Sequence, residues 1–333
     1  MENEIQNQIT EYKSFKQPKR GYSLPASIII SAVILASAWI YTNELKVSES
    51  QQGASVASDF QTKQKSALGE KVLPSAEVIL PVVWGDLGAR LISVGAIDAD
   101  KFKAIYEQRG LFTDEYKNLL LGQNDGQLKI TENNAGYLLN LFWALGLANK
   151  NPILDDGEMT NRAYGGAQNF ASTAGWTVAQ GNPMDHYSNH KFFDLTADQQ
   201  ALVDKISRGI YRPCCDNPTH FPDCNHGMAM LGLLELMASQ GVGEQDMWRA
   251  ALAANSYWFP DTYLTIASYM SSNGVDWDNV NPQEILGANF SSASGYARIA
   301  SQVQSQPQRG GSGCGVDAGR TTQPQRQQGG CGI

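Results

Sequence analysis

The sequence predicts a mainly α-helical protein that a single N-terminal helix anchors in a membrane. One observation is a charge-free apolar segment at 23–41, and another is a series of later runs with apolar residues at helical spacing. A third is a tail dominated by Gly, Gln, Arg and Pro, which is typical of a disordered segment. The predicted order is a cytoplasmic basic segment, a transmembrane anchor, a polar linker, an α-helical extracytoplasmic domain and a flexible tail, at residues 1–22, 23–41, 42–78, 79–305 and 306–333.

The apolar segment at 23–41 reads "SLPASIIISAVILASAWIY". It has about the length that a helix needs to cross ~30 Å of hydrocarbon. Four basic residues lie within 13–20, so the positive-inside rule places the N-terminus in the cytoplasm and the domain outside the cell membrane. The "ASA" at 36–38 resembles a signal-peptide cleavage site, and a buried core helix is a third reading, but the apolar run continues past 38. A single-pass anchor is therefore predicted, and the cysteines then face an oxidising compartment.

Composition excludes several classes of function. The formal net charge of −8 disfavours nucleic acid as a partner, because phosphate binding requires a basic surface. The 333 residues contain only five cysteines, so the fold is not a disulfide scaffold. A hydrophobic content of 42% is sufficient for an ordinary folded core.

Helix starts are marked by threonines. Thr113, Thr131 and Thr196 each precede a run with an acidic residue in its first turn and apolar residues at helical spacing. No run of alternating apolar and polar residues is convincing as a strand, so the sequence predicts no sheet.

The chemistry is concentrated in "YRPCCDNPTHFPDCNHGMAML" at 211–231. Pro213 ends a helix predicted at about 197–211, and Asp223 or Asn225 is expected to cap a second helix that starts near Cys224. A helix N-terminus favours a thiolate and a neutral imidazole, which are the forms that bind metal ions.

Cysteine, histidine and methionine together suit Cu(I) or Zn, which suggests a carrier, assembly or sensing role. The spacing matches no standard zinc signature, and two adjacent cysteines do not easily bind one ion through an unstrained trans backbone. Cys215 and Cys224 are expected as thiolate ligands and His226 as an imidazole ligand, with Met228 or His220 completing the set. The full list of candidate metal ligands is Cys214, Cys215, Cys224, His226, His220 and Met228.

Two alternatives remain open on the sequence. A disulfide between Cys224 and either Cys214 or Cys215 would close a loop of about ten residues and stabilise the fold by roughly 2–3 kcal/mol. In that case the protein is a helical scaffold or interaction domain. Alternatively the cysteines cycle as a thiol–disulfide redox protein, and the tail cysteines resolve mixed disulfides or form an intermolecular disulfide with a protein partner. The candidate redox residues are Cys214, Cys215, Cys224, Cys314 and Cys331.

His186 and His190 are spaced i, i+4, which allows both rings to bind one ion from a single helical turn. They form a possible second metal site. The pattern H-E-x-x-H is absent, so a zincin protease is not indicated. No histidine follows His226, which disfavours a cysteine hydrolase with the usual Cys-then-His order. No catalytic residue is assigned.

Overall fold

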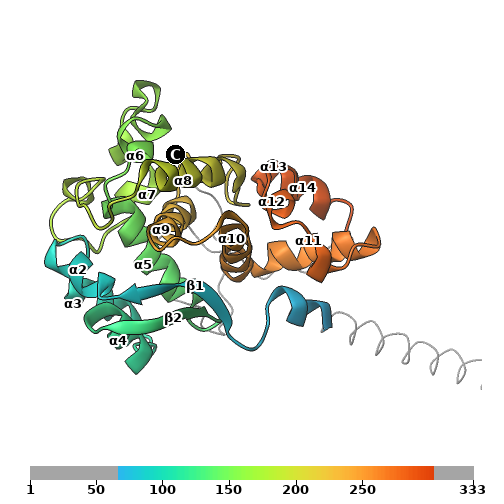
Figure 1. The fold of residues 1–333 in the computed structure, drawn as a ribbon, viewed down its shortest axis with the longest axis horizontal. Helices are drawn as coiled ribbons and strands as arrows, with labels where there is room; N and C mark the ends of the chain where they lie inside the picture. The colour runs from blue at the N-terminus through green and yellow to red at the C-terminus, as the bar shows by residue number, and fades with distance from the viewer. Residues whose placement is uncertain (1–66, 304–333) are drawn as a thin grey trace, which may run out of the picture. The chain divides into compact units, whose positions relative to one another are not determined.

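Two helices that are buried on every side form the centre of the structure. The computed structural model describes residues 67–303, in which α5 (Ala135–Ala148) packs along α9 (Asn225–Ser239) (Figure 1). Gly136 in α5 and Ser239 in α9 are the exceptions to complete burial. A helix that is apolar all round belongs in a protein core, so this pair organises the fold.

Other helices lie around the central pair, and the prediction of a mainly α-helical fold is confirmed for the described residues. Thr113 and Thr196 are N-caps as predicted, accepting hydrogen bonds from the backbone N–H groups of Tyr116 and Gln199. The surrounding α-helices are α2 (Leu87–Ser93), α3 (Ala99–Glu107), α4 (Asp114–Leu121), α6 (Pro152–Asp155), α7 (Ala171–Ala174), α8 (Ala197–Gly209), α10 (Glu244–Trp258), α11 (Pro260–Ser272), α12 (Pro282–Ile285), α13 (Ala288–Ser291) and α14 (Ala293–Ala300).

The two central helices approach each other through glycines. A Cβ atom on Gly146 of α5 would collide with the backbone carbonyl oxygen of Met228 in α9 and lie 2.9 Å from the amide nitrogen of Gly232. A Cβ atom on Gly232 would in turn collide with the carbonyl oxygen of Phe142. The backbones are therefore in direct contact at this crossing, and α9 has one permitted position relative to α5.

The structure also contains a two-stranded antiparallel sheet that the sequence did not predict. Strand β1 (Val78–Gly85) pairs with β2 (Asn124–Ile130), with Val78 opposite Ile130. The β1 sequence VILPVVWG is apolar on both faces, so it lacks the alternation typical of a half-buried strand. The backbone of β1 also forms two hydrogen bonds with a side chain. The Gln240 amide donates to the Val83 carbonyl and accepts from the Val83 N–H.

The folded part of the described chain begins before residue 79. Residues 67–72 form a short helical segment, and the side chain of Val72 is buried. Lys71 forms ion pairs with Asp276 and Asp278, at 2.7 and 2.6 Å. This stretch belongs to residues 42–78, which the sequence predicts as a polar linker from their content of Ser, Gln, Lys and Ala.

No helix among residues 67–303 is long and apolar enough to cross a membrane. The predicted basic segment and anchor at 1–22 and 23–41 lie outside the described residues. The predicted tail at 306–333, with Cys314 and Cys331, lies outside them as well.

One carboxyl group is buried in the middle of α9. Glu235 is completely buried, and neither of its carboxyl oxygens has a hydrogen-bond partner among the described residues. Burial raises the pKa of Glu235 well above its ordinary value, and the side-chain amides of Asn149 and Asn151 offset only part of this increase. The surroundings therefore favour the neutral acid over the carboxylate.

We expect replacement of Glu235 with glutamine to flatten the pH dependence of stability. The folded-state pKa lies above the unfolded value, so the folded state binds the proton more tightly. Proton binding by Glu235 therefore stabilises the folded state, and this stabilisation is complete below about pH 4.5. It is lost as the pH rises, by up to about 1.4 kcal/mol per pH unit. Urea unfolding between pH 5 and 8 should show this decline in the wild type and a smaller one in Glu235→Gln. An exposed control, Glu284→Gln, should keep the wild-type slope; equal slopes in all three proteins would contradict the assignment.

Candidate metal centre

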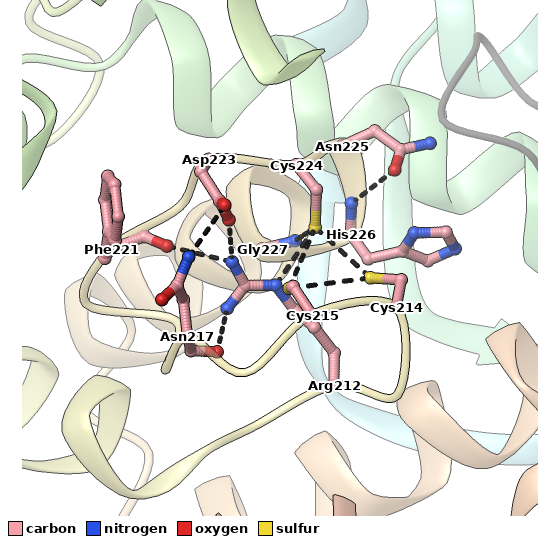
Figure 2. A network of polar contacts seen from close by, with 10 residues as sticks. All are labelled: Arg212, Cys214, Cys215, Asn217, Phe221, Asp223, Cys224, Asn225, His226 and Gly227. Carbon is pink, nitrogen blue, oxygen red and sulfur yellow. Dashed lines mark hydrogen bonds and ion pairs between the residues drawn. The ribbon is translucent and has the colours of Figure 1, made fainter. Parts of the chain in front are cut away.

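Three cysteine thiols converge beside the start of α9. They come from the Cys loop, defined as residues 210–224 between α8 and α9 (Figure 2). The Sγ–Sγ distances are 3.4 Å for Cys214–Cys224, 3.7 Å for Cys214–Cys215 and 3.9 Å for Cys215–Cys224. All three cysteines are free thiols. Three thiolates around one tetrahedral zinc ion, with Zn–S bonds of ~2.3 Å, are about 3.8 Å apart, so the triangle has the size of a zinc site.

The adjacent cysteines both lie beside Cys224, and each belongs to a different one of the two groups of possible metal ligands. The described backbone contains no cis peptide bond that would account for it. The loop is held from outside instead, because the Cys215 carbonyl accepts a hydrogen bond from the N–H of Ala293. The Asp216 carboxylate accepts from the N–H of Ser294, at the start of α14. These contacts orient the Cys214–Cys215 pair by tertiary structure.

Cys224 is itself the N-cap of α9. Its Sγ accepts a hydrogen bond from the backbone N–H of Gly227 at 3.4 Å. This corrects the prediction that Asp223 or Asn225 is the cap. The sulfur therefore lies at the positive end of the helix dipole, where negative charge is stabilised.

His226 is a buried imidazole without a hydrogen-bond partner. Its side chain is 1% exposed, and neither ring nitrogen forms a hydrogen bond within the described structure. The ring packs on Phe259, with the centroids 4.3 Å apart. The ligand atoms of Cys214, Cys224 and His226 all lie within 4.8 Å of one another. An unpartnered buried imidazole is unfavourable, so its position beside thiols indicates a ligand that would satisfy it.

Arg212 is a buried cation that sequence reasoning missed. Its side chain is 1% exposed, and its Nε donates to the Sγ of Cys224 at 3.0 Å. The two terminal nitrogens donate to the carbonyls of Asn217 and Phe221, each at 2.8 Å, and to the carboxylate of Asp223 at 2.5 Å (Figure 2). The signal available in the sequence was an arginine two residues before the vicinal cysteines, in "YRPCC".

These surroundings give the three thiols different acidities. Burial raises the pKa of Cys224, but hydrogen bonds from Cys214 and Cys215 and the charge of Arg212 outweigh it and hold the pKa well below its usual value. The hydrogen bonds with Cys215 and Cys224 raise the pKa of Cys214. The bond with Cys214 lowers the pKa of Cys215, but the bond with Cys224 and burial raise it to about 12. These surroundings favour the thiolate form at Cys224 and the thiol form at Cys214 and Cys215.

A second group of possible ligands shares one of these sulfurs. The ligand atoms of Cys215, Asp223 and Cys224 also lie within 4.8 Å of one another. The Asp223 carboxylate, however, is already bonded to Arg212 and to the side-chain N–H of Asn217. Of the two groups, the one formed by Cys214, Cys224 and His226 contains ring nitrogens that have no hydrogen-bond partner in the described structure.

The other predicted ligands have different surroundings. His220 belongs to neither group, and its Nε2 lies 2.7 Å from the carboxylate of Asp204 on α8. Met228 is completely buried within the hydrophobic core.

The histidines of the predicted second site contact each other but do not share a helical turn. Nδ1 of His186 lies 3.1 Å from Nε2 of His190, after a short 3₁₀ segment at Pro183–Asp185. The Nε2 of His186 bonds the carbonyl of Gln180 at 2.8 Å. Neither histidine belongs to a group of three ligand atoms within the described residues. Burial and the neighbouring ring of His186 lower the pKa of His190, which favours the neutral form of His190.

Cys214, Cys224 and His226 thus form a Cys/His group that could hold a metal ion, and Cys215 lies beside it with its Sγ 3.7 and 3.9 Å from those of Cys214 and Cys224. Comparison of the chain with protein-family models, with curated proteins and with solved structures gave no match.

Proposed function

We propose that the protein binds zinc through the thiolates of Cys214, Cys215 and Cys224 and the imidazole of His226. The observation that carries this proposal is the sulfur triangle of zinc dimensions beside a buried imidazole without a partner. Three sulfurs and one nitrogen are a standard ligand set for tetrahedral Zn²⁺. Cu(I) is the alternative ion, because it also favours thiolates.

The burial of the site supports a tightly held ion. Cys224 is 5% and His226 is 1% exposed, whereas Cys214 and Cys215 are partly exposed. Solvent and partners therefore reach the centre from the Cys214–Cys215 side. This arrangement suits an assembly or sensing role, in which the bound ion connects the Cys loop to α9, more than rapid metal transfer.

The setting of this centre is part of the same proposal. Residues 23–41 would anchor the chain in the cell membrane, with the basic N-terminal segment in the cytoplasm and the metal centre outside. The partner is then the membrane itself, and the cysteine-containing tail is available to a protein partner.

Titration of the full chain with zinc tests the proposal. The reduced, metal-free protein should compete with a chromogenic chelator for one Zn²⁺ per chain, and Co²⁺ should give the spectrum of a tetrahedral thiolate site. Binding of Cu(I) but not of Zn²⁺ would select the alternative ion. Absence of stoichiometric binding of either ion under reducing conditions would overturn the proposal.

A thiol–disulfide function is the second candidate, and one observation favours it. The Sγ atoms of Cys214 and Cys224 are only 3.4 Å apart, and Cys224 has the low pKa of a reactive thiol. Thiol counting at graded redox potentials separates the two functions. A redox-active pair should oxidise reversibly well above about −300 mV. A zinc centre should protect all three thiols until the metal is removed.

A further inference from the structure

We propose that Phe259 is the positioning residue for the imidazole ligand of this centre. The inference rests on the proposed zinc site and concerns a residue that binds no metal itself. It follows from the surroundings of the His226 ring, which lacks the contact that usually fixes a metal-binding histidine.

The His226 ring has no outer hydrogen bond. A metal-binding histidine almost always donates its second ring N–H to a carboxylate, a carbonyl or water, and this bond fixes the orientation of the ring. Neither ring nitrogen of His226 has a hydrogen-bond partner among the described residues. A metal ion beside Cys214 and Cys224 would occupy only one of the two nitrogens. Within the described structure, packing is therefore what orients this ring.

Two aromatic rings supply that packing. The centroid of the Phe259 ring lies 4.3 Å from that of His226, with 36° between the ring planes. Trp258 meets the same imidazole edge-on, with the centroids 6.2 Å apart. The χ2 torsion of a histidine has only broad intrinsic preferences, so a neighbouring ring at 4.3 Å restricts a rotation that the side chain itself would allow. Phe259 thus does for His226 what a hydrogen-bond acceptor does in other metal sites.

The backbone holds Phe259 itself in place at the junction of α10 and α11. Its N–H donates to the carbonyl of Asn255 at 2.8 Å, and its carbonyl accepts from the N–H of Tyr263 at 3.1 Å. The side-chain amide of Asn255 also donates to the carbonyl of Tyr211 in the Cys loop, at 3.1 Å. The junction that carries Phe259 is therefore tied to the loop that carries Cys214 and Cys215.

A double-mutant cycle in the full chain tests this role. Cys314→Ser and Cys331→Ser are included throughout, so that no tail thiol replaces the imidazole. Phe259→Leu keeps an apolar side chain but removes the flat ring, and the zinc affinity, measured by chelator competition, should fall by about 10-fold. In a His226→Ala background the same substitution should change the affinity by less than about 2-fold, because the side chain that Phe259 positions is absent. Equal losses in both backgrounds would reveal a general structural effect and overturn the role of Phe259.

Cobalt spectra separate the nitrogen ligand from the sulfurs. In Phe259→Leu, the d–d absorption of bound Co²⁺ should shift toward that of His226→Ala. The thiolate-to-cobalt charge-transfer absorbance per bound ion should stay at the wild-type value, because the sulfurs are untouched. Phe259→Tyr retains the ring and should restore both the spectrum and the affinity. Folded Phe259→Leu protein with the wild-type d–d spectrum and zinc affinity would also contradict the proposal.

Two further variants complete the test. Phe112→Leu removes the ring of another partly buried phenylalanine that packs on the core, between α3 and α4, and it should change neither quantity. Phe259→Ile also lacks the flat ring and replaces Phe259→Leu if that variant does not fold. Failure of the parent protein to bind Zn²⁺ or Co²⁺ would instead overturn the proposed zinc site.

Discussion

Replacement of Cys224 with serine is expected to abolish zinc binding. The Cys224 sulfur contacts the other two thiols, the Arg212 guanidinium and the N–H of Gly227, so it is the central ligand of the group. A serine hydroxyl is too weakly acidic to replace a thiolate. Zinc affinity should fall by more than about 100-fold, since the loss of an outer hydrogen-bond partner alone costs 10–100-fold.

The consequence for stability is equally large. A ligand present at 1,000 times its Kd stabilises the folded state by about 4 kcal/mol, so zinc should raise the melting temperature of the wild type and leave that of Cys224→Ser unchanged. Met230→Leu is the matched control, because it alters a buried side chain of the same helix at nearly constant volume. It should bind zinc normally. Wild-type zinc affinity in Cys224→Ser would show that the sulfur triangle is not the binding site.

Replacement of Gly146 with alanine is expected to destabilise the whole domain by about 3 kcal/mol. The new methyl group would collide with the Met228 carbonyl oxygen of α9, and a helix backbone cannot move aside as a flexible side chain does. The collision occurs one turn beyond Cys224, so α9 must shift together with Cys224 and His226. Loss of zinc affinity should therefore accompany the loss of stability, as measured by urea unfolding and chelator competition.

Gly243→Ala is the control for this substitution. Gly243 has a φ of −71° and no neighbour within 4 Å of an added Cβ atom, so alanine causes no collision there and should cost at most about 1 kcal/mol, because alanine is a poorer N-cap of α10 than glycine. A Gly146→Ala protein with wild-type stability would show that α5 and α9 are not in backbone contact.

Much of the helical structure follows from local sequence. Thr196 and Gln199 form a capping box at the start of α8, and this pair can be recognised in the sequence by its spacing of three residues. The helix ends at Gly209, four residues before Pro213, close to the predicted end. Strand β1 could not be predicted in this way, because its sequence is apolar on both faces although only Leu80, Val82 and Trp84 are buried, so the alternation is absent from the letters.

The candidate site was likewise only partly predictable from the sequence. Residue type and clustering pointed to Cys214, Cys215, Cys224 and His226, since soft ligands lie close together at the start of an apolar helix. The sequence could not choose between metal, redox and structural readings, because loop backbones permit many thiol arrangements. Hydrogen bonds from α14 to the Cys loop orient the adjacent cysteines, and they join residues that are 78 positions apart.

Sequence by itself determined the helical class, the N-caps at Thr113 and Thr196, and the one short segment in which the candidate ligands gather. These properties depend on neighbours within a few positions of the chain, so local patterns are sufficient. Only the tertiary structure decided that Arg212 contacts the Cys224 sulfur, that His226 has no hydrogen-bond partner, and that His220 pairs with Asp204 instead. Those outcomes depend on which distant groups share a buried volume, and burial is what makes an unpaired imidazole or a thiolate without a cation costly.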